Sequence, residues 1–179
     1  MALGATMFVF DVELADADRG VYQNLALRVA RHPSESDDHL VARVLAWCLE
    51  YTEGIAYSRG LSEPDEPAIA IRDLTGQLTT WIDIGAPEAA RLHRAAKSAA
   101  RVVVYTHKDA EQLATRLRGA RIHRVELLEL YAFDREFIAA IVARLQRRMA
   151  FSLTVSERQL YLTVDGSDLS SAIERISLV

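Results

Sequence analysis

The chain has 179 residues, of which 50% are hydrophobic and 26% charged, and its formal net charge is −4. This length and composition predict one globular domain with a full core, and no apolar run approaches the roughly 20 residues that a membrane span needs. The acidic balance argues against a protein that mainly coats nucleic acid, because such binding depends on neutralising phosphates, but it leaves room for a local basic groove. Cys48 is the only cysteine, so no internal disulfide can form and we expect a cytoplasmic protein.

The periodicity of the first half predicts two hairpins separated by a helix. Alternating residues indicate strands over 4–14 and 21–30. A helix is expected from the capping pair Ser34 and Asp37 to about Tyr51. A short strand and the acidic loop "SRGLSEPDEP" follow, and then a second hairpin over 68–73 and 77–85.

The second half alternates helices with strands. A helix is expected from Pro87 to about Ala100, a buried strand over "RVVVYTH", and a helix over 108–119 that ends at Gly119. "RIHRVELLEL" (121–130) is predicted as a strand, 134–148 as a helix capped by Asp134, and 149–164 as a closing strand pair. The whole chain, 1–179, is therefore predicted to be one α/β domain with a mixed central sheet flanked by helices.

One acid, Asp83, lies near the end of a strand that is predicted to be buried. A two-residue loop at Thr75-Gly76 would place Ala68 opposite Asp83 and Glu66 on the same face as Asp83, whereas a one-residue bulge would bring Asp65 to that face. Two carboxylates this close repel unless a cation lies between them, and hard oxygen ligands favour Mg²⁺ or Mn²⁺. The pattern therefore predicts a divalent-metal site that could activate water against a phosphate.

The helix that follows Gly85 carries several cations. On a helical wheel Arg91, Arg94 and Ser98 share one edge of its buried stripe, and Lys97 lies further toward solvent. Guanidinium groups on that edge suit phosphate oxygens. The alternative is that Arg91 simply pairs with Asp83.

Several motifs, taken together, resemble the YaeQ family of bacterial proteins. They are "ARHPSES", "SRGLSEPDEP", "WIDIGAPEAARLHRA" and "VVVYTH", in the family's order and spacing. The resemblance implies a compact restriction-endonuclease-like fold of the PD-(D/E)xK superfamily with added N- and C-terminal strands. In that superfamily a helix acid, an Asp near a strand end and a (D/E)xK motif surround a divalent metal.

Carried over residue by residue, the resemblance implies a metal site made by three acids. Glu35 resembles the helix acid. Asp65, or Glu66 beside it, resembles the acid of PD. Asp83 resembles the acid of (D/E)xK, but the lysine position of that motif is Gly85.

The missing lysine leaves the function open. The following helix would supply the cation, with Arg94 the first choice and Lys97 the second, but arginine stays protonated and cannot act as a base. The resemblance implies a metal-dependent phosphodiesterase acting on nucleic acid, whereas the missing lysine weighs against hydrolysis more than against metal or phosphate binding. The alternative is a non-catalytic module that binds nucleic acid or a protein, and a third interpretation makes the acids a structural ion-pair cluster with Arg59, Arg91 and Arg94.

Residues near the proposed acids have two interpretations each. His32 could bind a phosphate or fasten the strand-to-helix turn, and Arg31 and Arg59 could be ion-pair partners of the acids. His39, four residues after Glu35, could join a metal pair, but a hydrogen bond is the commoner arrangement.

Two further features could belong to a nucleic-acid surface. Trp81 could stack on a base or pack in the core against the helix that carries Glu35. The basic stretch over 116–124 could extend the surface or simply be solvated.

Overall fold

The computed structural model describes residues 4–58 and 65–179, and these divide into two compact units. Unit 1 comprises Met1–Val41 and Phe133–Ile173, and unit 2 comprises Ala42–Ala132 and Glu174–Val179. Each unit contains a mixed sheet, so the prediction of one central sheet is wrong although the mixed α/β class is confirmed. The predicted single domain over 1–179 stays a prediction. Within the described ranges, no helix combines the length and the apolar character required to cross a membrane.

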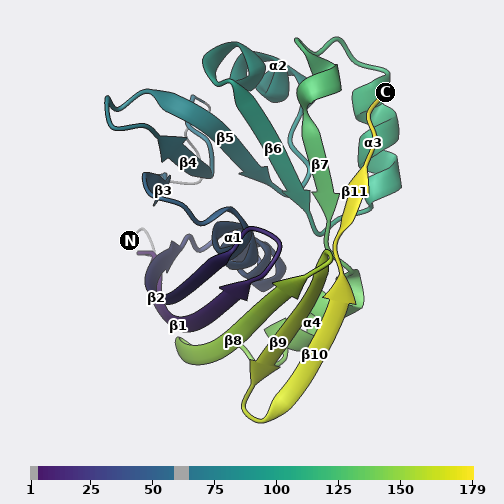
Figure 1. The fold of residues 1–179 in the computed structure, drawn as a ribbon. Helices are drawn as coiled ribbons and strands as arrows, with labels where there is room; N and C mark the ends of the chain where they lie inside the picture. Colours follow the sequence, from purple (N-terminus) through teal and green to yellow (C-terminus); the bar gives the residue numbers. More distant parts are fainter. Residues whose placement is uncertain (1–3, 59–64) are drawn as a thin grey trace. The chain divides into compact units, whose positions relative to one another are not determined.

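Unit 1 is built on a five-stranded sheet with the order β10-β9-β8-β1-β2 (Figure 1). β1 and β8 are parallel and the other neighbours antiparallel. One face is apolar because buried and exposed residues alternate along the strands, and the buried side chains of α4 add to this core. The elements are β1 (Thr6–Asp16), β2 (Val21–Arg31), α4 (Arg135–Val142), β8 (Arg148–Ser156), β9 (Gln159–Val164) and β10 (Ser167–Ala172).

Unit 2 is built on a six-stranded sheet with the order β11-β7-β6-β5-β4-β3, in which β5, β6 and β7 are parallel. Helices α2 and α3 connect these parallel strands, and right-handed crossovers put both helices on one face. Helix α1 (Asp37–Glu50) begins in unit 1 and ends in unit 2. The other elements are β3 (Ile55–Tyr57), β4 (Ile69–Arg72), β5 (Leu78–Ile84), α2 (Ala89–Ser98), β6 (Arg101–Thr106), α3 (Ala110–Arg118), the 3₁₀ turn η1 (Val125–Leu127), β7 (Glu129–Ala132) and β11 (Glu174–Ile176).

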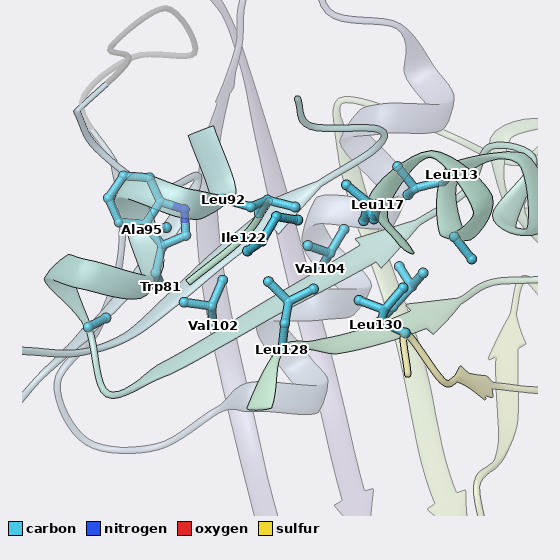
Figure 2. Close-up of a cluster of buried hydrophobic side chains, with 13 residues drawn as sticks. Trp81, Leu92, Ala95, Val102, Val104, Leu113, Leu117, Ile122, Leu128 and Leu130 are labelled. Carbon is cyan, nitrogen blue, oxygen red and sulfur yellow. The ribbon is translucent and has the colours of Figure 1, made fainter. Parts of the chain in front are cut away.

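The α2 and α3 face of this sheet carries an apolar core (Figure 2). Trp81 of β5 belongs to it, together with Leu92 of α2 and Leu117 of α3, both fully buried. The expectation that Trp81 packs against the helix bearing Glu35 is therefore wrong. Trp81 packs with α2 because it alternates with Thr80 and Ile82, which point to the opposite face.

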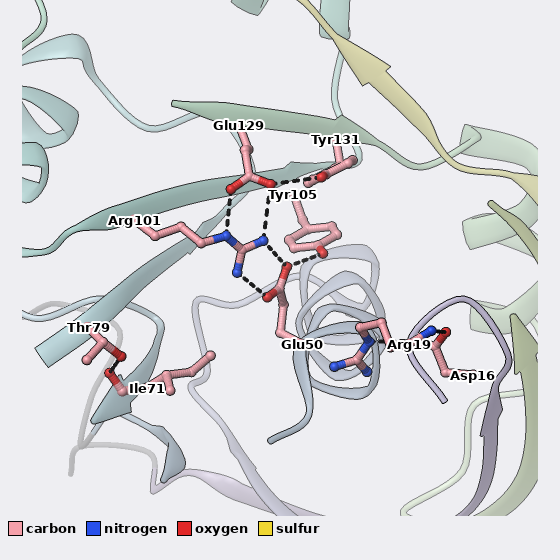
Figure 3. Close-up of polar contacts among 9 residues, drawn as sticks. All are labelled: Asp16, Arg19, Glu50, Ile71, Thr79, Arg101, Tyr105, Glu129 and Tyr131. Atoms are coloured by element: carbon pink, nitrogen blue, oxygen red, sulfur yellow. Dashed lines mark hydrogen bonds and ion pairs between the residues drawn. The ribbon is translucent and has the colours of Figure 1, made fainter. Parts of the chain in front are cut away.

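The opposite face of the sheet is joined to the end of α1 by a polar network (Figure 3). The guanidinium of Arg101, on β6, donates to Glu50 at 2.6 Å and to Glu129 at 2.6 Å. Tyr105 donates to Glu50 at 2.5 Å, and Tyr131 donates to Glu129 at 2.9 Å. Burial and the nearby Glu50 carboxylate raise the pKa of Tyr105 well above its ordinary value, so its hydroxyl stays a donor at neutral pH.

The β4–β5 register confirms the predicted facing of Asp83. Ala70 pairs with Trp81. Continuing this register by two residues places Ala68 opposite Asp83, as expected. The turn itself is longer than two residues. Asp73 N donates to Gln77 O, and Gly76 N donates to Asp73 O, while a register shift between Ile71 and Arg72 absorbs the extra residue. The bulge restores the alignment that a two-residue turn would have produced.

Three local predictions are corrected, and one of them is the helix over 134–148, which ends at Val142 before β8 begins at Arg148. α1 starts at Asp37, and its cap is Ser36 rather than Ser34, because the Ser36 hydroxyl accepts from His39 N at 3.1 Å. The predicted strand over 121–130 is a loop followed by η1, and only 129–132 is a strand. Arg124 has a left-handed φ of 51°, which ends extended structure there. The sequence analysis did not predict β10 or β11.

Candidate functional site at the end of β5

Asp83 and Arg91 form a bidentate ion pair between β5 and α2. Arg91 Nε lies 2.8 Å from Asp83 Oδ2 and Nη2 lies 2.9 Å from Oδ1. The Asp83 residue is only 3% exposed, and Ala68 N approaches its Oδ1 at 3.4 Å. A planar guanidinium matches a carboxylate in this geometry, so both oxygens of the strand acid are already engaged. The alternative expectation, that Arg91 pairs with Asp83, is the one observed.

Arg91 also fixes the segment that carries the loop acids. Its Nη2 donates to the backbone oxygen of Glu66 at 2.7 Å, and its guanidinium carbon lies 5.2 Å from the centre of the Trp81 ring. Glu66 is half-buried and Asp65 is exposed. Arg91 therefore links the strand end, the loop and the tryptophan.

Gly85 occupies the lysine position for a backbone reason. Its φ is +93°, and its N–H donates to Tyr105 O at 2.9 Å, which holds the chain against β6 as it leaves β5. A residue with a side chain costs roughly 1–2 kcal/mol in the left-handed region. A lysine at this position would therefore be strained, and α2 supplies the nearby cation instead.

The predicted site residues of unit 1 pair with one another. Glu35 is buried and its carboxylate hydrogen-bonds His39 Nδ1 at 2.5 Å. Arg31 donates to Asp37 at 2.5 Å. His32 Nδ1 lies 2.6 Å from the hydroxyl of Ser34 and accepts from Ser34 N. His32 therefore fastens the turn, and His39 makes the expected hydrogen bond.

Convergence of Glu35 with Glu66 and Asp83 stays a prediction, because Glu35 belongs to unit 1 and the other two belong to unit 2. Within each unit, over residues 4–58 and 65–179, no three His, Cys, Asp or Glu side chains are grouped so that they could hold a metal. Arg59 lies outside the described residues. The observed part of the site is therefore the Asp83–Arg91 pair with the Glu66 backbone.

The solvent face of α2 carries a second polar feature. Lys97 is exposed, as the helical wheel predicts, and Arg94, which the wheel places on the same edge as Arg91, is exposed as well. His93 lies on the edge of α2 away from Arg91, where its Nδ1 accepts from His123 N at 3.0 Å. This bond joins α2 to the basic stretch after α3. We call the resulting group the basic cluster: His93, Arg94, Lys97, Arg121, His123 and Arg124.

The electrostatics of His93 show that these groups are close. Burial lowers the pKa of His93 from its ordinary value of 6.5, and the positive charges of Lys97, His123 and Arg121 lower it further. For Arg94, Lys97, Arg121 and Arg124, the described part of the chain shows no ion-pair partner. The basic cluster is thus an accumulation of unneutralised positive charge, although the chain as a whole is acidic.

Comparison with known proteins places these features in a family. The family model described as "YaeQ protein" matches residues 1–173. The chain belongs to the YaeQ family. It is 31% identical to the uncharacterized protein YaeQ of Escherichia coli (strain K12) over 170 residues, 94% of each chain. Relative to the crystal structure of YaeQ from Xanthomonas axonopodis pv. citri the TM-score is 0.88 at 30% identity, covering 97% of this chain and 98% of the other. Relative to YaeQ from Pseudomonas syringae the TM-score is 0.87 at 25% identity, covering 97% and 96%.

The sequence analysis of this YaeQ-family chain missed two groups of residues. The Glu50–Arg101–Glu129 network was not predicted, although an arginine at the start of the apolar strand "RVVVYT" is the kind of half-buried charge that needs partners. His93 was also missed. Its signal was its position four residues before Lys97, on one face of a cationic helix.

We predict that the ring of His93 titrates below 6.5 in the folded protein. Because protonation is easier in the unfolded chain, the stabilising contribution of neutral His93 is fully present above pH 6.5 and is lost as the pH falls through the folded-state pKa. A pH titration of the His93 ring signals by NMR measures this value, and Lys97→Met should move it upward. A folded-state pKa at or above 6.5, or one insensitive to Lys97→Met, would contradict the electrostatic account of the cluster.

Proposed function

We propose that this YaeQ-family chain is a non-catalytic nucleic-acid-binding module that retains the nuclease-like fold of the PD-(D/E)xK superfamily and works in the cytoplasm. The basic cluster is the observation that carries the proposal. Four of its cations are exposed, and none has a recorded ion-pair partner among the described residues. Phosphate groups would relieve the mutual repulsion of these charges and would release counterions on binding.

The layout of α2 separates this binding face from the buried ion pair. Arg91 faces Asp83, whereas Arg94 lies about 60° and Lys97 about 120° further round the helix, and both are exposed. Arg121 and Arg124 flank the opposite edge of the helix, where Arg124 and Ala96 line the same small hollow. A phosphate chain could therefore contact the cluster without disturbing the Asp83–Arg91 pair.

Two features of the strand end argue for binding without hydrolysis. Both oxygens of Asp83 are held by one guanidinium, so a metal ion would have to displace Arg91 before it could coordinate there. The backbone at Gly85 is left-handed and lacks the lysine that would activate a nucleophile. Water activation would then depend on a metal ion. Both oxygens of Asp83 already accept from Arg91, so this carboxylate leaves no oxygen to coordinate the ion.

We predict that nucleic-acid binding depends on the outer cations. Labelled single- and double-stranded DNA and RNA oligomers should bind in fluorescence anisotropy with a dissociation constant that rises steeply with salt. The double variant Lys97→Gln/Arg121→Gln should weaken binding about tenfold or more, and it should reduce the slope of log K against log salt by about 2.

The matched control is Arg135→Gln/Arg147→Gln, which removes the same charge from exposed positions of unit 1. It should leave affinity and salt slope almost unchanged. Equal losses in the two double variants would show only a net-charge effect and would reject the cluster as the binding face. No salt-sensitive binding to any oligomer would reject the proposed function.

Metal-dependent phosphodiester hydrolysis is the second candidate function, and Glu66 favours it. Arg91 touches the Glu66 backbone and the Asp83 carboxylate, while no partner for the Glu66 carboxylate is recorded within the described residues. Displacement of Arg91 would then leave two acids on one side of the sheet. Mg²⁺ or Mn²⁺ would be the fitting ion, with Glu35 as the third acid that the family resemblance implies.

Thermal melts with and without excess Mg²⁺ or Mn²⁺ separate the two candidates. For the binding module we predict no change in the melting midpoint. A hydrolytic metal site would raise the midpoint by about 3 °C at tenfold excess over the metal's Kd, and Asp83→Asn would abolish the increase. Such an increase, together with metal-dependent cleavage of a labelled oligomer, would overturn the non-catalytic proposal.

A further inference from the structure

Strand β2 is a long edge strand of the unit 1 sheet. It is the last strand in the order β10-β9-β8-β1-β2, and it pairs with β1 in an unbroken register over its 11 residues. Edge strands are normally blunted by bulges, prolines, lysines or short length. The sequence "VYQNLALRVAR" contains no proline, glycine or lysine, so these devices are absent from this strand.

The hydrogen-bond pattern shows which backbone groups face outward. Val9 N donates to Arg147 O and Ala17 N to Val155 O, so the odd-numbered residues of β1 bond to β8. The even-numbered residues of β1 therefore bond to β2, where they meet odd-numbered partners. The N–H and C=O groups of Tyr22, Asn24, Ala26 and Arg28 consequently point away from β1, and no backbone partner is recorded for them among the described residues.

The exposed face beside this edge carries unpaired charges of both signs. Glu13 and Asp11 alternate along β1, and Arg28 lies on β2, all exposed. No ion pair of these three is recorded within the described ranges. Small side chains leave a hollow of about 480 Å³ next to the acids, lined by Asp11, Glu13, Asn24, Ala26, Ala150 and Ser152 among others. The edge is therefore bordered by an acidic hollow and by an exposed arginine that forms no ion pair with these acids among the described residues.

We propose that a second copy of this chain pairs antiparallel with β2, about a two-fold axis at Ala26. This register puts Arg28 opposite Asn24 of the second copy, and the facing residues exchange pairs of backbone hydrogen bonds. Because Asn24 pairs with Glu13 on β1, each Arg28 then lies two strands, or about 10 Å, from Glu13 of the other copy. An arginine and a glutamate side chain together span that distance across the small residues of the hollow.

The same contact is not available within one chain. Arg28 and Asn24 are four residues apart along β2, or about 13 Å, so Arg28 and Glu13 of one copy lie along the diagonal. The two-fold pairing brings Arg28 of one copy closer to Glu13 of the other than the two residues lie within one copy. Symmetry makes this contact twice. Charge complementarity therefore favours a second copy of the chain over an extended peptide of unspecified charge.

The test is charge reversal measured by sedimentation equilibrium of the full chain. The parent should associate to twice the mass of the 20.0 kDa chain. Arg28→Glu or Glu13→Arg alone should raise the dimer dissociation constant at least about a hundredfold, because each change places like charges at two symmetric contacts. The double variant Arg28→Glu/Glu13→Arg should restore dimerisation. Both positions are exposed, and circular dichroism checks that each variant is folded.

Three results would overturn the proposal. The first is a parent that stays monomeric throughout the concentration range. The second is a dimer that neither single reversal weakens, which would place the interface elsewhere. The third is a double variant that fails to restore association. Since none of these changes lies in the basic cluster, nucleic-acid binding provides an independent readout.

Discussion

The Asp83–Arg91 ion pair is the contact on which the chemistry of unit 2 depends. It neutralises the buried acid of β5, and it fixes the rotation of α2 by holding one side chain against the sheet edge. With Arg91 directed inward and Leu92 buried in the core, the 3.6-residue repeat leaves Arg94 and Lys97 facing solvent. The same pair therefore removes charge from the strand end and leaves positive charge on the outer surface of the helix.

The two faces of the unit 2 sheet use guanidinium–carboxylate contacts for different purposes. On the face that the end of α1 contacts through Glu50, Arg101 lies between Glu50 and Glu129. Although burial opposes its charge, hydrogen bonds to Glu129 and Glu50 raise the pKa of Arg101, so this network holds its charge at any physiological pH. On the α2 face, Asp83 pairs with Arg91 and Glu88 pairs with Arg116, whereas Arg94, Lys97, Arg121 and Arg124 have no acidic partner in the described part of the chain. The Arg101 network is structural, whereas the cations on the α2 face leave positive charge with which a ligand can interact.

The sequence predicted the parts of the fold that follow from local periodicity and register. The β4–β5 alignment was correct because alternation fixes which face Asp83 occupies, even though a bulge replaced the expected tight turn. The break at 121–124 was missed because the left-handed Arg124 is not signalled by residue type. The division into two sheets was also missed, since β1 pairs with β8 across more than a hundred residues and no local pattern encodes that contact.

The site was predictable as a set of residue types but not as a set of pairings. Arg91 and Asp83 were both identified, and the choice between phosphate binding and mutual pairing required the observed geometry. In the sequence, Gly85 stands where the (D/E)xK motif has its lysine. The positive φ of Gly85 shows that the backbone conformation at this position favours glycine. The basic cluster needed the His93–His123 contact, which joins segments 30 residues apart and follows from tertiary packing alone.

A double-mutant cycle on Asp83→Asn and Arg91→Met, measured by urea unfolding, tests the central claim most directly. If the two side chains neutralise each other, each single variant destabilises the chain and their coupling energy is about 2 kcal/mol. Independent, additive effects within about 0.5 kcal/mol would show that Arg91 does not hold the Asp83 carboxylate, and would return that acid to the list of available metal ligands.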